Sequence, residues 1–227
     1  MATPDEITVD GFDKQMQTNH LSHFLLTKEL FPLLQASSKG CGDARIVQHS
    51  SLARNQTENN RLEEKYLEKQ EKNGMLGGDE DSSFIGAQWS RYFQTKLANS
   101  VFHQALHERL TKSENKDCKN VLSLCCHPGM SSTSLYNHLS EDQNVFLKPI
   151  IGAIQSLLFQ SPADGAMGLI KGMMSPKDKV EGGTLYGPKY FTGYAVALTS
   201  GSHETDPNSM DMLWKKSEDA TGVSFDL

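Results

Sequence analysis

The sequence lacks several features that would place its 227 residues in a well-defined class. No run of apolar residues is long enough to span a bilayer, and the start lacks the charged-then-apolar order of a secretory signal. The formal net charge of −6 provides no basic surface for nucleic acid. The four cysteines show no CxxC spacing, so we expect reduced thiols in a reducing compartment, with the cytoplasm as the default location.

What is present is the size and the pattern of one α/β domain. Apolar residues recur at helical spacing in residues 10–35, 88–112 and 161–174. Two short runs, residues 44–51 and 120–126, predict strands, and the second is almost continuously apolar before "HPG". Such a run is typical of a strand buried on both faces of a parallel sheet. Helices that alternate with buried strands predict an α/β architecture.

Several local details follow from the same patterns. Asp10 is the expected cap of the first helix, and Ser161 the expected cap of the third. The run "GGTLYGP" predicts one more short strand, and residues 146–159 predict another helix. Residues 54–85 are almost wholly polar, which favours a solvated insertion with a helical turn around "LEEKYLEKQE".

Tyr92 and Lys96 are the first candidates for chemistry. Four residues along a helix places two side chains on one face. A free tyrosine, with a pKa of about 10, is a poor proton donor or acceptor at neutral pH, and a nearby ammonium group lowers that pKa. The spacing alone is weak evidence because it arises often by chance, so a pair of surface residues is the alternative.

Three further segments accompany this pair. "RIVQHSS" ends a predicted strand with Ser50 and Ser51, whose hydroxyls could bond a carbonyl or alcohol oxygen. "TNHLSHFLLT" lies before it, and "HPGMSST" leaves a buried strand end, where α/β sheets bind ligands. In this order, with "YFQTKLAN", the segments resemble the short-chain dehydrogenase/reductase family, in its retinol-dehydrogenase-like branch. That branch's patterns look like "NHLGHFLLT", "RIVNVSS", "YxxSKLAN" and "HPGxVxT". The resemblance runs across nearly the whole chain, including "LWKKSE" at 213–218.

The resemblance implies the C-terminal part of a Rossmann-type doubly wound parallel sheet with flanking helices. It also implies an NAD(P)-dependent oxidoreductase that interconverts a carbonyl and an alcohol on a lipophilic small molecule. Tyr92 would be the acid/base, and Lys96 would lower the pKa of Tyr92 and bond the nicotinamide ribose. Ser51, with Ser50 as its substitute, would orient the substrate oxygen, and Asn19 would hold a water of the proton relay.

The same resemblance assigns the cofactor and substrate segments. Pro128, Gly129 and Thr133 would form the loop that grips the nicotinamide, and residues 130–160 would form a substrate flap. Members of the family often pair their tyrosine-bearing helices, so a homodimer is expected. Between NADP and NAD the family favours NADP. His103 and His107 have the spacing of two zinc ligands on a helix, but no third ligand is evident in the sequence. No metal site is therefore predicted.

One family motif is absent. A Gly-rich turn resembling TGxxxGxG, followed by NNAG, would seat the pyrophosphate, and neither pattern occurs here. The opening "MATPDEITVDGFD" resembles the family text just after NNAG. We therefore expect an N-terminally truncated form, short by about 80–100 residues if each βαβ unit takes about 30 or more. Its first strand would then be an exposed sheet edge. The alternative is a non-catalytic fragment or interaction protein that cannot bind cofactor alone.

Overall fold

A four-stranded sheet forms the centre of the molecule. The computed structural model describes residues 1–77, 86–131, 159–190 and 192–227. The sheet order follows the chain order, and the strands are β1 (Ala44–His49), β2 (Val121–Cys126), β3 (Leu185–Lys189) and β4 (Tyr194–Leu198). β1, β2 and β3 run parallel, whereas β4 runs antiparallel to β3. The predicted α/β fold with a largely parallel sheet is confirmed, and β4 is an addition to it.

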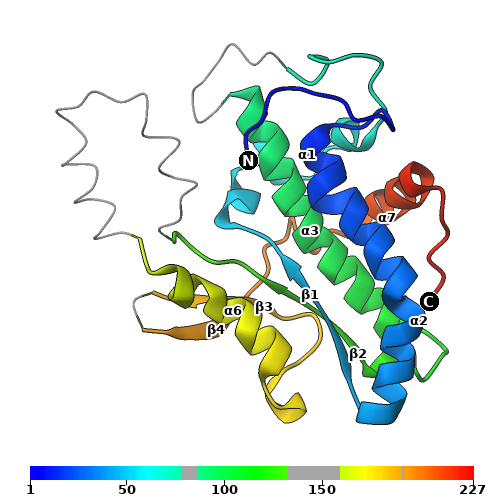
Figure 1. Cartoon of the computed structure of the whole chain (residues 1–227), viewed down its shortest axis with the longest axis vertical. Coiled ribbons are helices and arrows are strands. Elements are labelled where there is room, and N and C mark those ends of the chain that lie inside the picture. Colours follow the sequence, from blue (N-terminus) through cyan, green and yellow to red (C-terminus); the bar gives the residue numbers. More distant parts are fainter. Residues whose placement is uncertain (78–85, 132–158, 191) are drawn as a thin grey trace.

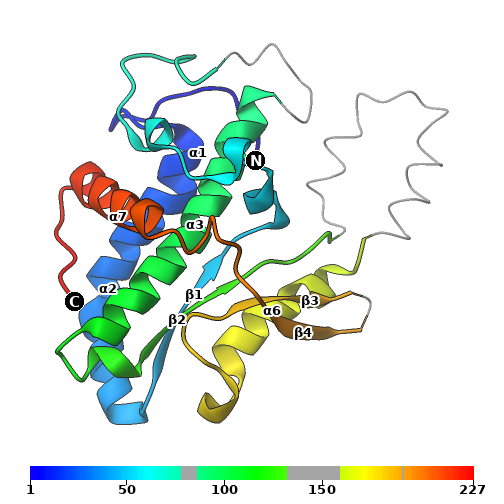
Figure 2. The same cartoon turned by 180° about the vertical axis from the view of Figure 1, so that it is seen from behind.

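Helices cover both faces of this sheet. One layer holds α2 (Ser22–Cys41), α3 (Ala87–Lys112) and α7 (Pro207–Thr221), and α6 (Pro162–Met174) lies on the opposite face, as Figures 1 and 2 show. α3 lies where the sequence predicted it because its apolar stripe is fully buried; the stripe consists of Phe93, Leu97, Val101 and Ala105. In the described ranges, no helix has both the length and the apolar character that a membrane span needs.

The N-terminal helical rod is less regular than its sequence suggested. It consists of α1 (Lys14–Met16), a π-helical turn η1 (Gln17–Leu21) and α2 in direct succession. The prediction that Asp10 caps it is wrong. Asp13 is the cap, and its carboxylate accepts a hydrogen bond of 2.8 Å from the backbone N–H of Met16. The chain between Asp10 and Asp13 makes a turn and a short bridge, so the helix can begin only at Lys14.

α6 approaches the sheet closely because its inner face is made of glycine. Gly165, Gly168 and Gly172 are its buried residues. A Cβ atom at Gly172 would lie 3.2 Å from Cγ1 of Val47, on β1. The cap predicted at Ser161 is confirmed, since its hydroxyl accepts a hydrogen bond of 3.1 Å from the N–H of Asp164.

An aromatic cluster fills the space between α2, α3 and α7. Its rings lie 5.2–5.9 Å apart between centroids, mostly tilted or edge-on, and belong to Phe24, Phe102, Trp214 and Phe225. All of these side chains are buried. The closing segment of the chain therefore belongs to the core.

The polar segment after β1 forms short helical turns and contributes side chains to the core. It forms short 3₁₀ turns at Leu52–Gln56, Glu58–Asn60 and Glu64–Leu67, and the third is the helical turn expected there. The expectation of a wholly solvated segment is wrong, because Tyr66 and Leu67 are buried in the core with Leu62. The predicted helix at 146–159 lies almost entirely outside the described residues.

Candidate active site

A cavity of about 570 Å³ opens at the carboxyl ends of β1 and β2. Its wall is formed by residues 49–53 at the end of β1 and just after it, by residues 128–131 after β2, and by one face of α3. Met1 and Gln56 complete the lining. This is the position at which ligands bind to parallel α/β sheets, outside the carboxyl ends of the strands.

Tyr92 and Lys96 both line this cavity from the first turns of α3. The ammonium nitrogen of Lys96 lies 5.8 Å from the centroid of the Tyr92 ring, and it donates a hydrogen bond of 3.4 Å to the carbonyl of His49. Burial lowers the pKa of Lys96 from its usual value. Trp89 stands edge-on to Tyr92, with 6.1 Å between the ring centroids. The helix thus presents the expected pair together against an apolar wall.

The two serines after β1 have different environments. Ser50 is fully buried, and its hydroxyl donates a hydrogen bond of 2.7 Å to the backbone carbonyl of Lys96. Ser51 is half-buried and caps the turn that follows, accepting a bond of 3.2 Å from the N–H of Ala53. That bond uses a lone pair of the Ser51 oxygen, so the hydroxyl hydrogen can still donate to a ligand. Both serines line the cavity, and Ser51 is the better placed to act on a bound oxygen.

Asn19 does not line the cavity; it lies on the π-helical turn η1 behind it. Its amide donates a hydrogen bond of 3.0 Å to the hydroxyl of Thr95, which in turn donates 2.8 Å to the carbonyl of Tyr92. π-helical turns are rare and frequently mark functional sites. The structure therefore connects Asn19 to the turn of α3 that bears Tyr92 and Lys96.

The loop after β2 supplies the opposite wall. Pro128 and Gly129, which the family resemblance assigns to the nicotinamide loop, line the cavity. Gly129 has φ +65°, and a Cβ atom there would lie 2.7 Å from Cγ of Pro188, so both the backbone conformation and the space require glycine. Thr133 and most of the predicted flap, residues 130–160, lie outside the described residues.

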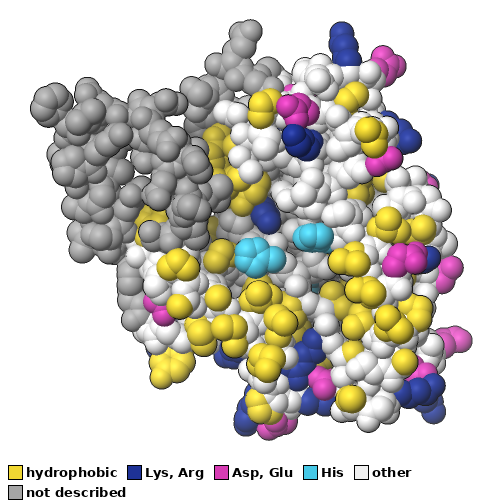
Figure 3. Space-filling model, in the orientation of Figure 1, with side chains coloured by type: hydrophobic (Ala, Val, Ile, Leu, Met, Phe, Trp, Pro, Cys, Tyr) yellow, Lys and Arg dark blue, Asp and Glu magenta, His cyan; other side chains and the backbone are white. Residues whose placement is uncertain are grey.

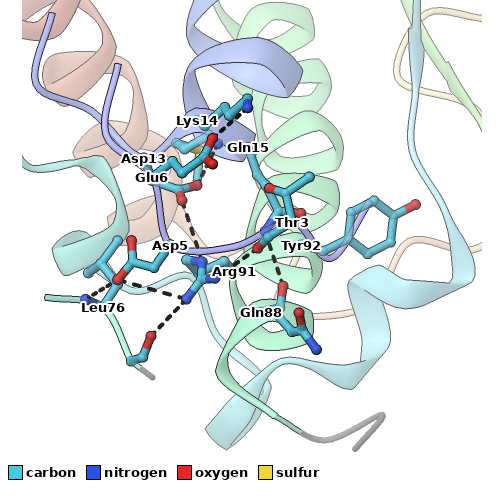
Figure 4. A network of polar contacts seen from close by, with 12 residues as sticks. Thr3, Asp5, Glu6, Asp13, Lys14, Gln15, Leu76, Gln88, Arg91 and Tyr92 are labelled. Carbon is cyan, nitrogen blue, oxygen red and sulfur yellow. Dashed lines mark hydrogen bonds and ion pairs between the residues drawn. The ribbon is translucent and has the colours of Figure 1, made fainter. Parts of the chain in front are cut away.

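A buried charge network next to Tyr92 was not predicted from the sequence. Arg91 is fully buried and forms ion pairs with Asp5, at 3.9 Å, and Asp13, at 3.5 Å (Figure 4). Its guanidinium also donates hydrogen bonds to the carbonyls of Thr3, at 2.9 Å, and Gly77, at 3.2 Å. These contacts hold the N-terminal segment against the start of α3. No local pattern identifies such an arginine, because its partners are remote in sequence.

A second unpredicted pair lies beneath the serine loop. The guanidinium of Arg54 donates to the carboxylate of Glu204, and both side chains are buried. Arg54 also donates a bond of 2.9 Å to the backbone carbonyl of Ser51. In the described part of the chain, no group of three or more His, Cys, Asp or Glu side chains converges as a metal site would require.

The chain is similar to several known proteins. No protein-family model matches the chain. It is 29% identical to human polyprenol dehydrogenase over 225 residues, covering 98% of this chain and 58% of the relative. It is 31% identical to human retinol dehydrogenase 14 over 181 residues, covering 79% of this chain and 45% of the relative. A crystal structure of a protein from Mycobacterium paratuberculosis superposes with a TM-score of 0.64 at 28% identity, covering 100% of this chain and 65% of the other.

A tyrosine, a lysine and a serine line a cavity at the carboxyl ends of a largely parallel sheet, where α/β folds bind their ligands. The comparisons make the class specific: the chain belongs to the short-chain dehydrogenase/reductase family, with retinol and polyprenol dehydrogenases among its relatives. The family resemblance seen in the sequence is confirmed. The chain matches the C-terminal part of the two human dehydrogenases and spans 58% of the first and 45% of the second.

Proposed function

We propose that this chain carries the catalytic site of an NAD(P)-dependent oxidoreductase that interconverts a carbonyl and an alcohol on a lipophilic small molecule. The observation that supports it is the convergence of Tyr92, Lys96 and Ser51 on one cavity. The rest of that wall is largely apolar, with Trp89 and Phe93 from α3 among its members. A cavity of this size with a mainly apolar wall suits a lipophilic small molecule that carries a carbonyl or an alcohol.

In the reducing direction, the Tyr92 hydroxyl gives its proton to the substrate oxygen. The hydroxyl of Ser51 donates a hydrogen bond to the same oxygen and orients it. Lys96, beside the Tyr92 ring, favours the ionised phenol that remains after the transfer. Asn19 supports this turn of α3 through Thr95 and would hold a water of the relay that returns the proton. General acid–base groups of this kind contribute roughly 10²–10⁴-fold to rate.

The described residues fit one end of a dinucleotide. Lys96, Pro128 and Gly129 face the cavity and would hold the nicotinamide riboside, and Thr133 is proposed to join them. When bound, the cofactor supplies or accepts the hydride. The Gly-rich turn that would seat the pyrophosphate has no counterpart in the sequence, and this favours a second candidate function. In that alternative the chain is a non-catalytic interaction protein of the same family.

The test compares two tyrosine variants of the purified chain in an aldehyde-reduction assay that follows NADPH or NADH consumption. Tyr92→Phe removes the proton donor and should lower the rate at least about 100-fold. Tyr194→Phe removes a hydroxyl from an exposed tyrosine on β4 and should leave the rate unchanged. Equal rates for the two variants would overturn the assigned role of Tyr92. Reduction of an aldehyde by the wild-type chain would rule out the non-catalytic alternative.

A further inference from the structure

The sequence contains a single Asn-Gly pair, Asn73 and Gly74, and the structure places it on an exposed turn of the polar segment after β1. Gly74 has φ +82°, which glycine adopts without strain, and no atom of the described residues lies within 4 Å of where its Cβ would be. Charged side chains project at the top of the molecule in Figure 3, where Figure 1 draws the segment that ends at residue 77. Water therefore reaches this turn, and no side chain crowds the backbone of Gly74.

The side-chain amide of Asn73 is held by the N-terminal segment of the chain. Its Oδ1 atom accepts a hydrogen bond of 2.9 Å from the backbone N–H of Ile7. A donor in this position stabilises the negative charge that forms on the oxygen when a nucleophile adds to the amide carbon. The Nδ2 group of the same amide donates no hydrogen bond to any described residue, so nothing retains it as a leaving group.

The nucleophile is the next backbone nitrogen, that of Gly74, which can close a five-membered ring on the side chain of Asn73. Its N–H donates no hydrogen bond within the described part of the chain. Two Asp-Gly pairs, residues 10–11 and 164–165, could close the same ring. In each of them the glycine N–H already donates a bond of 3.0 Å, to the carbonyl of Thr8 and of Ser161 respectively. The contrast in hydrogen bonding singles out Gly74.

We propose that Asn73 is a modification site, at which the chain converts its own asparagine to iso-aspartate. The Gly74 nitrogen loses its proton and forms a bond to Cγ of Asn73, and the carbonyl electrons move onto Oδ1. When these electrons return, the bond from Cγ to Nδ2 breaks, and Nδ2 takes up the proton and leaves as ammonia. A succinimide ring remains.

Water then opens the ring. Its OH adds to the main-chain carbonyl carbon of residue 73, the bond from that carbon to the Gly74 nitrogen breaks, and the second hydrogen of the water returns to the nitrogen. The backbone now runs through Cβ and Cγ of residue 73, and the former main-chain carbonyl is a free carboxylate. Addition of water at Cγ instead gives ordinary aspartate. No oxidant, metal or cofactor takes part.

The change matters because the same turn is tied to the clamp beside Tyr92. The N–H of Leu76 donates a hydrogen bond of 2.8 Å to the carboxylate of Asp5, and the carbonyl of Gly77 accepts one of 3.2 Å from Arg91 (Figure 4). Iso-aspartate lengthens the backbone by one carbon just before these residues and shifts them relative to both partners. The N-terminal segment is therefore held less firmly against α3 in the modified chain. The reaction needs no catalytic activity, so it stands apart from the proposed function.

The test incubates the purified 227-residue chain in mildly alkaline buffer and follows every asparagine and aspartate by peptide mass spectrometry, with fragmentation that distinguishes iso-aspartate from aspartate. Residue 73 should convert about tenfold or more faster than residues 10–11 and 164–165, and its rate should rise with pH because the nitrogen must lose its proton. Gly74→Ala should slow the conversion about tenfold or more, since a Cβ atom hinders the attack. Asn208→Gln, at an exposed position on α7, is the control and should leave the rate at residue 73 unchanged.

Hydrogen exchange of the fresh and the aged chain tests the structural consequence. The amides of residues 5–7 and of Leu76 should exchange about tenfold or more faster after ageing. Asn73→Gln cannot close the five-membered ring, so its exchange should be the same before and after incubation.

Three results would overturn the proposal. Residue 73 could persist as asparagine for as long as residue 208 does, or it could convert no faster than the two Asp-Gly pairs, a comparison that needs no variant. Conversion at an equal rate in Gly74→Ala would exclude the backbone nitrogen of residue 74 as the nucleophile. If the converted chain exchanged like the fresh one, the effect on the clamp would be refuted.

Discussion

Replacement of Glu204 by glutamine would leave the guanidinium of Arg54 buried without its carboxylate. The side chain of Arg54 is 6% exposed and that of Glu204 1% exposed, so water cannot take the place of the lost charge. His203, whose ring lies 3.8 Å from the Glu204 carboxylate, cannot replace it either. The same guanidinium fixes the carbonyl of Ser51 at 2.9 Å, which connects this pair to the candidate site.

The expected loss follows from the burial of both partners. Removal of one member of a buried ion pair costs about 3–5 kcal/mol, because the remaining charge is uncompensated. Glutamine keeps the shape and one acceptor oxygen, so we expect the lower end, about 3 kcal/mol. With a urea m-value of about 3 kcal/mol per molar, the unfolding midpoint should fall by about 1 M.

The assay is urea unfolding of wild type and variants, followed by circular dichroism. Asp211→Asn is the matched control, because its carboxylate pairs with Arg109 at 3.1 Å but is 77% exposed. That variant should lose less than about 1 kcal/mol. The double variant Arg54→Met/Glu204→Leu removes both charges and should recover most of the loss. If Glu204→Gln shifts the midpoint no more than Asp211→Asn does, the reasoning from burial is refuted.

Three further outcomes are expected. Burial lowers the pKa of His103 to about 3, so only the unfolded chain takes up its proton below about pH 6.5, and this residue alone removes up to about 1.4 kcal/mol of stability for each unit by which the pH falls. Burial also lowers the pKa of His20, His49 and His127, which makes the slope of the whole chain steeper. His103→Asn should reduce that slope by up to about 1.4 kcal/mol per unit in urea midpoints between pH 7 and 5, and an unchanged slope would contradict this expectation. Gly129→Ala should lower the melting temperature more than Gly42→Ala, because both have positive φ but only Gly129 has neighbours within 4 Å; equal losses would mean that crowding is irrelevant. Phe24→Ala should cost about 3–5 kcal/mol in denaturant unfolding, and a loss below about 1 kcal/mol would show that its ring contacts matter little.

The parts of the fold that follow from local pattern could be predicted. α3 carries an apolar stripe at helical spacing, β2 is a nearly continuous apolar run, and Ser161 followed by Pro162 is a strong helix start, so α3, β2 and α6 lie where expected. β4 was not predicted although its five residues are all apolar, because so short a run without alternation cannot be assigned to a strand by periodicity alone. The burial of Leu67 also depends on contacts that are distant in sequence. The many charged residues next to it made the segment look solvated.

The candidate site shows the same division. The placement of Tyr92 and Lys96 on one face of a helix follows from their spacing alone. The contrast between the two serines depends on the direction in which the chain leaves β1, because Ser50 turns to the carbonyl of Lys96. The buried Arg91 network depends on Asp5 and Asp13, more than seventy positions away in the numbering. Three-dimensional proximity of this kind has no local signature.

The π-helical turn changes what the N-terminal rod can present to its neighbours. The N–H of Ser22 bonds the carbonyl of Gln17, five residues earlier, so the turn contains one residue more than an α-helix would. Successive residues of an α-helix are rotated by about 100° around its axis. The extra residue therefore changes the direction in which every later side chain of the rod points. Met16 and Leu21 both reach the core although five positions separate them, and Asn19 lies at the joint. Deletion of one residue from this turn would make the rod a continuous α-helix. The apolar side chains on the two sides of the turn could then no longer all face the core while the amide of Asn19 faces α3.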